Sequence, residues 1–187
     1  MQIDRVYFPS QTLGYGSRIS MWLIGCPHHC FRCSNPELWV PDPSRDVSVE
    51  DLLQAILPYL SKADGVTITG GEPFLQSESL LQLLIELRKV FKGDILVFTG
   101  YTIRELSSNA VSQRCLNYID VLIDGKYEDD RNNNIGLRGS DNQTIHRLNP
   151  LFSSRYEGAE SWKRNSQVVV CDNKIISIGI PIKEKKQ

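Results

Sequence analysis

The stretch 65-GVTITGGEPFLQSESLLQLLIELRKVF-91 joins a strand, a glycine turn and a helix in direct succession. Its first five residues, Gly65 to Thr69, are rich in β-branched side chains, which favour a strand. From Ser77 to Phe91 the leucines recur at the spacing of an amphipathic helix. The stretch therefore predicts one strand–loop–helix unit, the building block of a sheet with parallel strands.

Similar units flank this stretch on both sides. The sequence pattern predicts further strands over residues 18–24, 94–99 and 119–123, and further helices over residues 48–60 and 103–116. Strands that alternate with helices pair in parallel through right-handed crossovers. Four such units are too few to close an eight-stranded barrel, so the sequence predicts an α/β sheet or barrel segment with one open side.

Polar or glycine-containing segments follow each predicted strand. They are the loop that begins at Cys26, the turn 70–72, the segment 99–101 and the pair 124–125. In parallel α/β sheets, ligands bind at the carboxyl ends of the strands. We therefore expect these four segments to converge on one edge of the sheet and to form a binding site there.

Three of the five cysteines lie close together, at Cys26, Cys30 and Cys33. Thiolates at such short spacing hold a metal in most proteins. An iron–sulfur cluster with one iron free of protein ligands, a zinc site completed by His28 or His29, and a redox dithiol all fit this spacing. The spacing alone leaves these three interpretations open.

Composition excludes several classes of protein. The chain has 187 residues, enough for one well-cored domain, and a formal net charge of −1, which indicates no nucleic-acid partner. Its apolar runs are shorter than the roughly 20 residues of a membrane-spanning helix, and its first residues do not resemble a signal peptide. The odd number of cysteines also argues against a disulfide framework. We therefore expect a cytoplasmic protein.

The C-terminal part of the chain differs from the alternating units. Residues 132–143 are rich in Asn and Gly and predict a long loop. Apolar runs at 168–171 and 175–178 flank Asp172-Asn173-Lys174 and predict a β-hairpin, followed by a lysine-rich tail. We expect this hairpin to cover an open edge of the sheet, with docking of a partner as the alternative.

The cysteine loop and the glycine turn together carry a resemblance to a known superfamily. Cys26-x3-Cys30-x2-Cys33 after the first strand, with Gly70-Gly71-Glu72-Pro73 after the second, resembles the radical S-adenosylmethionine enzymes. Within them, the chain is similar over residues 1–148 to the activating proteins of the anaerobic ribonucleoside-triphosphate reductase. The stretches that carry this similarity are 14-GYGSR-18, 33-CSNPELW-39, 99-TGY-101, 120-DVLIDGK-126 and 138-RGSDNQ-143.

The resemblance implies a fold and a reaction. The fold is an α/β incomplete TIM-type barrel over residues 1–148, and residues 149–187 form a C-terminal extension with a β-hairpin. The reaction is reductive cleavage of S-adenosylmethionine at one [4Fe–4S] cluster, followed by hydrogen abstraction from a glycine of a partner enzyme. The implied partners are a glycyl radical enzyme, the anaerobic ribonucleotide reductase, and an electron donor such as flavodoxin or ferredoxin.

The resemblance also assigns roles to individual residues. Cys26, Cys30 and Cys33 would ligate three irons of the cluster. A guanidinium can stack on adenine as an aromatic ring does, and Arg32 stands where many members of the superfamily carry that ring. The residues implied to contact S-adenosylmethionine are Arg32, Cys33 and Ser34 on the adenosine side, Gly70, Gly71 and Glu72 at the methionine amino group, and Thr99 and Asp124 near the ribose or amino end.

Two other functions remain open on the sequence alone. The first is a radical enzyme that modifies a peptide or a small molecule instead of a reductase. The second is a non-enzymatic interaction module that binds zinc through the three cysteines and a histidine. No protein side chain is predicted to act as a catalytic acid or base, because in this chemistry the cofactor supplies the reactive species.

Overall fold

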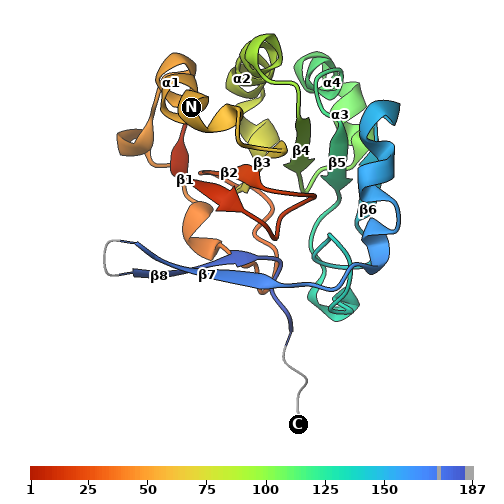
Figure 1. Cartoon of the computed structure of the whole chain (residues 1–187). Helices are drawn as coiled ribbons and strands as arrows, with labels where there is room; N and C mark the ends of the chain where they lie inside the picture. The colour runs from red at the N-terminus through yellow and green to blue at the C-terminus, as the bar shows by residue number, and fades with distance from the viewer. Residues whose placement is uncertain (172–173, 184–187) are drawn as a thin grey trace.

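A computed structural model describes residues 1–171 and 174–183 of the chain. Its centre is a six-stranded sheet in the order β1-β2-β3-β4-β5-β6, and a separate hairpin contains β7 and β8 (Figure 1). The strands are β1 (Ile3–Ser10), β2 (Arg18–Leu23), β3 (Gly65–Gly70), β4 (Asp94–Phe98), β5 (Val121–Asp124), β6 (Thr144–Arg147), β7 (Ser166–Cys171) and β8 (Lys174–Gly179).

The four central strands are parallel, as the alternating pattern predicts. β2 pairs with β3, β3 with β4 and β4 with β5 in parallel register. The two edge strands, β1 and β6, are antiparallel to their neighbours and were not expected from the sequence. β1 has shifts in its register and a half-exposed side-chain pattern, and β6 has only 4 residues, so neither shows regular alternation. The fold is therefore mixed α/β with a mainly parallel sheet.

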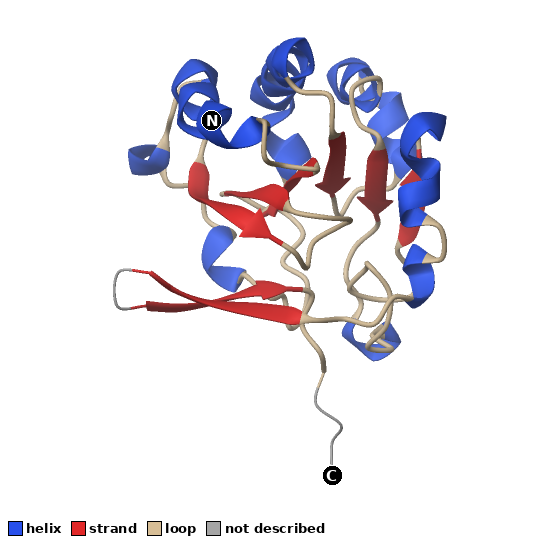
Figure 2. Ribbon diagram, in the orientation of Figure 1, coloured by secondary structure: helices blue, strands red, loops and turns tan. Residues whose placement is uncertain are grey.

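Helices cover one face of this sheet (Figure 2). They are α1 (Val49–Leu60), α2 (Ser77–Val90), α3 (Ile103–Ser108) and α4 (Ala110–Leu116). The expected single helix over residues 103–116 is wrong, because Asn109 interrupts it. The Asn109 side chain accepts hydrogen bonds from the N–H groups of Val111 and Ser112 and so caps a new helix.

Alternating side chains along the strands build a separate core on each face of the sheet. Ile19 and Met21 of β2 pack with the helices in the largest core. Trp22, between Met21 and Leu23, lies on the opposite face, where it packs with Leu13 and with Ile178 of β8. A third core forms where short 3-10 helices over residues 150–161 pack against β4, β5 and β6.

The C-terminal hairpin has a different position from the expected one. It is present as an antiparallel pair with the register Val168↔Ser177 and Val170↔Ile175. It does not extend the large sheet, because β1 and β6 occupy the sheet edges. It crosses instead on the side away from helices α1 to α4, below β1 and β2 in Figure 1, and packs against Trp22 of β2. The expected turn at 172–173 and the end of the lysine-rich tail, 184–187, lie outside the described residues.

None of the helices within residues 1–171 and 174–183 is both long enough and apolar enough to cross a membrane.

Candidate active site

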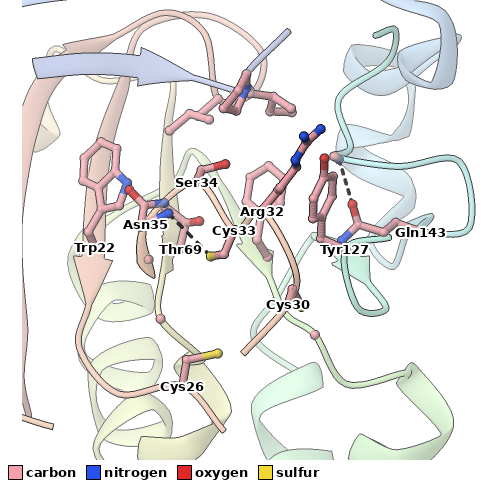
Figure 3. Close-up of a pocket in the computed structure, with 18 of the residues that line it drawn as sticks. Trp22, Cys26, Cys30, Arg32, Cys33, Ser34, Asn35, Thr69, Tyr127 and Gln143 are labelled. Atoms are coloured by element: carbon pink, nitrogen blue, oxygen red, sulfur yellow. Dashed lines mark hydrogen bonds between the residues drawn. The ribbon is translucent and has the colours of Figure 1, made fainter. Parts of the chain in front are cut away.

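A cavity of about 640 Å³ lies at the carboxyl ends of the parallel strands. The cysteine loop after β2, the glycine turn after β3 and the Thr99-Gly100 segment after β4 all line it, as does Gly125 after β5. The expected convergence of the four strand-end segments is therefore what the fold produces. Figure 3 shows the cysteine loop, with Arg32, Ser34 and Asn35, facing Tyr127 and Gln143 across this space.

The cysteine loop is held by its own backbone. The N–H groups of Gly25 and Cys26 donate to the carbonyls of Leu38 and Trp39, at 2.7 and 2.9 Å. All three loop cysteines are free and partly buried. Burial raises the pKa of the Cys26 and Cys30 thiols above its ordinary value of 9.0.

The donor set of the cysteine loop suits a cluster. Within residues 1–171 and 174–183, no three Cys, His, Asp or Glu side chains are grouped so that they could hold a single ion. A structural zinc site needs four protein ligands. A cluster with one iron open to a small molecule needs only the three thiolates that the loop offers.

The two adjacent histidines of the cysteine loop contact different residues. The Nε2 atom of His28 lies 3.0 Å from Oε2 of Glu72, and its ring meets the Tyr101 ring edge-on at 4.6 Å. The His29 ring stacks on Trp39 at 4.7 Å. Each histidine thus connects the cysteine loop to a different part of the protein.

Glu72 is the centre of the polar network below the cavity. Its side chain is fully buried, and its carboxylate accepts hydrogen bonds from the Thr99 hydroxyl at 2.8 Å and the Gly100 N–H at 2.7 Å. It also accepts from the Phe74 N–H at 3.0 Å and contacts His28. One carboxylate therefore joins the cysteine loop, the glycine turn and the end of β4, which fixes their relative positions.

The two glycines of the turn allow the ends of β2 and β3 to approach closely. Gly70 has a φ of +103°, and a Cβ atom on Gly71 would lie 2.3 Å from the Gly25 carbonyl oxygen. The N–H groups of Gly71 and Glu72 donate to the carbonyls of Leu23 and Gly25, each at 2.7 Å. The Gly71 carbonyl, by contrast, accepts no hydrogen bond from the described residues, and Gly71 is one of the residues that line the cavity.

Nine of the ten residues singled out in the sequence line this cavity. Arg32, which has a φ of +56°, also contacts Asp129 at 3.3 Å. Asp124 is the exception, because its carboxylate accepts from the Ile103 N–H and lies 3.0 Å from the His146 ring, away from the cavity. The nine residues are Cys26, Cys30, Arg32, Cys33, Ser34, Gly70, Gly71, Glu72 and Thr99.

Sequence reasoning missed several parts of the cavity wall. Tyr127 and Gln143 line it, and Gln143 bridges two loops by accepting from the Gly139 N–H and donating to the Gly125 carbonyl, both at 2.7 Å. Tyr127 could have been predicted as part of the site, because it lies close to the strand-end pair 124–125 in the sequence. The C-terminal extension also lines the cavity, through residues 165, 166, 177 and 179–182, and no local pattern indicates this.

Known proteins resemble this chain over most of its length. Residues 12–146 match a family described as a 4Fe-4S single cluster domain. The anaerobic ribonucleoside-triphosphate reductase-activating protein of Pasteurella multocida is 36% identical over 151 residues, covering 76% of this chain and 95% of that protein. Proteins of the same name from Haemophilus influenzae and Escherichia coli K12 are 34% and 31% identical over 150 residues, covering 76% of this chain and 96% of each relative.

A solved structure gives a weaker likeness. The crystal structure of QueE from Escherichia coli covers 54% of this chain and 52% of its own, with 28% identity and a TM-score of 0.44. That score is too low to define the fold.

Proposed function

The chain belongs to the family of anaerobic ribonucleoside-triphosphate reductase-activating proteins, and we propose from this premise how its cavity carries out the reaction. It is a radical S-adenosylmethionine activating enzyme with one [4Fe–4S] cluster. Its substrate in this proposal is a glycine of a partner glycyl radical enzyme, the anaerobic ribonucleotide reductase, from which it abstracts a hydrogen atom.

One observation carries the proposal. The cysteine loop, which ends at Cys33, and the glycine turn, which begins 37 positions later at Gly70, line the same cavity at the strand ends. A site that held only a metal cluster would explain the cysteine loop, but it would not explain why the glycine turn lines the same cavity. Their juxtaposition supports a site in which a cluster would lie next to a backbone acceptor for the amino group of S-adenosylmethionine.

The cluster end of the site is formed by Cys26, Cys30 and Cys33. Three thiolates leave one iron of a four-iron cluster without a protein ligand, and that iron is open to a small molecule. The chemistry that the cluster and S-adenosylmethionine supply together is one-electron cleavage of a sulfonium, which yields a radical able to abstract hydrogen from a glycine Cα. The protein contributes position and exclusion of competing reactions.

The other polar groups of the cavity suit different parts of S-adenosylmethionine. The Gly71 carbonyl, which no described residue occupies, would accept from the methionine amino group. Arg32 and Ser34 would lie along the adenosine, with the Arg32 guanidinium against the flat ring. Thr99 and Glu72 support this surface from below through their mutual hydrogen bond. Asp124 would act indirectly, by holding the N-terminus of α3 through the Ile103 N–H.

The remaining features of the proposal concern architecture and partners. The six-stranded sheet would be an incomplete barrel whose open side admits the reductase. Residues 1–148 would form the core that performs the chemistry, and residues 149–187 an added segment. The electron donor would be a small redox protein such as flavodoxin or ferredoxin. The free thiols of the cysteine loop suit the reducing conditions of the cytoplasm, which we propose as the location.

An anaerobic activity assay tests the proposal. The protein is reconstituted with iron and sulfide, given S-adenosylmethionine and a strong reductant, and analysed for 5′-deoxyadenosine. Cys30→Ala is compared with Cys115→Ala, because Cys115 is a buried thiol of the helix-side core and outside the cavity. We expect Cys30→Ala to lose at least about a thousandfold in rate, since the cluster loses a ligand, and Cys115→Ala to stay within about threefold.

Addition of the anaerobic reductase encoded in the same genome completes the assay. A glycyl radical signal in its electron paramagnetic resonance spectrum is the expected result. Cleavage of S-adenosylmethionine without this signal would favour the alternative function, in which the substrate is a peptide or a small molecule. A protein that takes up one zinc ion and no sulfide would refute the radical mechanism altogether.

A further inference from the structure

The C-terminal hairpin presents one continuous face that begins inside the cavity and ends outside it. In an antiparallel pair, directly opposed residues share a face, and the side chains alternate along each strand. The register of β7 and β8 therefore places six residues on one face, which we call the hairpin platform: Ser166, Val168, Val170, Ile175, Ser177 and Gly179.

The inner end of the platform belongs to the reaction cavity. Ser166, Ser177 and Gly179 all line it, on the wall contributed by the C-terminal extension. The same wall continues through Ile180 and Ile182. In Figure 3 the hairpin passes above the cysteine loop, on the side toward which Arg32 points. A molecule that lies on the platform therefore has access to the space above the cysteines.

The outer end of the platform is apolar and exposed. Val168, Val170 and Ile175 have 65%, 72% and 77% of their surface accessible to solvent. The opposite face of the hairpin is not available, because Ile178 is buried and packs against Leu13. A contiguous row of exposed β-branched side chains is unusual on a monomer and marks an interaction surface.

The hairpin is firmly attached to the rest of the protein at its base. Arg164, just before β7, is buried and donates to the carbonyls of Ile135, Gly139 and Pro181 at 3.0 to 3.1 Å. The Thr12 hydroxyl donates to the Ile178 carbonyl at 2.9 Å. The inner end of the platform is therefore a preformed surface and loses little freedom when a ligand binds.

The segment that follows β8 is fastened as well. Lys183 contacts Asp129 through its ammonium group at 2.8 Å, and its backbone exchanges two hydrogen bonds with the Asn134 side chain. Asp129 in turn contacts Arg32 of the cysteine loop. The wall of the extension and the cysteine loop are thus tied to each other across the cavity.

The chemistry of the platform selects among possible occupants. None of its six residues carries a charge. Nucleic acids and anionic membrane surfaces are bound by clusters of Lys and Arg, which the platform does not offer. Small hydroxyl groups near the cysteines and β-branched side chains farther out suit an extended polypeptide, with a small residue at the inner end and apolar residues along the rest.

We propose that the hairpin platform binds the extended segment of the partner reductase that carries the target glycine. This inference rests on the proposed function, which requires a glycine to arrive above the cysteine loop. It goes further in assigning the contact to a segment of this chain beyond residue 146, where the family match ends. The platform would guide the segment from the hairpin tip into the cavity.

Paired variants at the outer end of the platform test this proposal. In Val168→Glu/Ile175→Glu, two exposed side chains become charged while the packed face of the hairpin stays intact. Val168→Thr/Ile175→Thr keeps the β-branched shape and guards against loss of the hairpin itself. Val90→Glu is the matched control, because Val90 is 55% exposed at the end of α2, in the helix layer.

Two activities are measured for each variant. We expect the charged double variant to lower kcat/KM for radical formation on the reductase at least about tenfold, mainly through KM, because charges replace apolar contacts. Cleavage of S-adenosylmethionine without the reductase should stay within about twofold, because the platform's outer end does not contact the cofactor site. The threonine variant should show the same split more weakly, and Val90→Glu should change neither activity.

Several results would overturn the proposal. Unchanged reductase activation in the charged variant would do so, and so would an equal fall in both activities. A wild-type dimer that this variant dissociates would assign the platform to self-association instead.

If the wild-type chain forms no radical on the reductase, the proposed function fails but the platform remains testable. A variant that carries a photo-crosslinking residue at position 168 is then mixed with the same reductase and irradiated. A crosslink to the reductase would support the platform, and no crosslink would overturn it.

Discussion

The two ends of the parallel strands use polar residues in opposite ways. At the amino ends, Arg18 begins β2 and Asp94 begins β4, both fully buried, and they pair at 2.7 Å. The Arg18 guanidinium also donates to the Thr67 hydroxyl and the Val66 carbonyl, and the Tyr156 hydroxyl donates to Asp94. Every group in this network thus has a partner within the chain.

At the carboxyl ends, the polar groups are arranged around an open cavity. Cys26, Cys30 and Cys33 are free there, and the Gly71 carbonyl accepts no hydrogen bond from the described residues. Groups that already have partners stabilise the fold, whereas groups that lack them are available to a ligand. The comparison therefore separates residues that maintain the structure from residues that we propose hold the cofactors.

Replacement of the buried Arg18 should have the largest effect on stability. It directly tests the polar network at the amino ends of the strands. Arg18→Met leaves the buried Asp94 carboxylate without its main partner, so we expect a loss of about 3–5 kcal/mol in the free energy of unfolding. Urea denaturation of the anaerobic apoprotein measures this loss. The cleavage rate per folded molecule should stay within about threefold, because Arg18 does not line the cavity.

A surface arginine provides the control for this experiment. The Arg131 side chain is 52% exposed, and its ion pair with Asp141 lies at the surface. Arg131→Met should cost less than about 1 kcal/mol. Equal losses in the free energy of unfolding for the two variants would show that the polar network at the amino ends does not contribute the stability assigned to it.

The adjacent histidines His28 and His29 test the arrangement at the carboxyl ends of the strands. His28→Ala removes the contact between the cysteine loop and Glu72, so we expect the affinity for S-adenosylmethionine to fall about tenfold. His28→Gln, which can still hydrogen-bond, should restore most of it. The change that S-adenosylmethionine causes in the spectrum of the reduced cluster reports the binding directly.

His29→Ala serves as the matched control, because it alters the same loop but leaves Glu72 in place. It removes a stacked ring from Trp39 and should weaken binding by less than about threefold. If both alanine variants weakened binding equally, His28 would have no special role in positioning the loop.

The smallest expected effect concerns the contact between the extension and the cysteine loop. Hydrogen bonding from Lys183 is the main cause that lowers the pKa of Asp129 below its ordinary value of 3.8, with further lowering from Tyr127 and Arg32. A carboxylate whose pKa is lower in the folded state stabilises the protein above its unfolded pKa. That contribution is lost as the pH falls through the folded pKa.

Thermal unfolding of the apoprotein at different pH values measures this contribution. The difference in Tm between the wild type and Asp129→Asn should be constant from about pH 6 to 8 and should shrink below about pH 4. Asp130→Asn, at the exposed neighbouring position, should show no such trend. A difference that grows on acidification would contradict the assigned contact.

Much of the fold and of the site could be predicted because it depends on local patterns. The β-branched run at 65–69 and the leucine spacing at 77–91 indicate their elements without reference to distant residues. The parallel order of the strands then follows from the alternation of strands and helices. Convergence of the strand-end segments is a consequence of that order, so the cavity could be anticipated as well.

The parts that could not be predicted depend on contacts between distant segments. The split of the expected helix at Asn109 reflects one side chain that caps a new helix. The role of Glu72 emerges only when the Thr99 hydroxyl and His28 are brought to it from other strands. Similarly, the burial of Arg18 is apparent only because Asp94 begins a strand two positions away in the sheet.

By itself the sequence determined which groups are offered for chemistry: three closely spaced cysteines and a glycine turn, each placed after a strand. Only the tertiary structure decided where the C-terminal extension lies and that it contributes to the cavity wall through residues 165, 166, 177 and 179–182. The physical reason is that spacing along the chain controls local conformation and ligand type. The packing of a hairpin across a distant site depends on buried contacts such as those of Arg164 and Ile178, which no local pattern records.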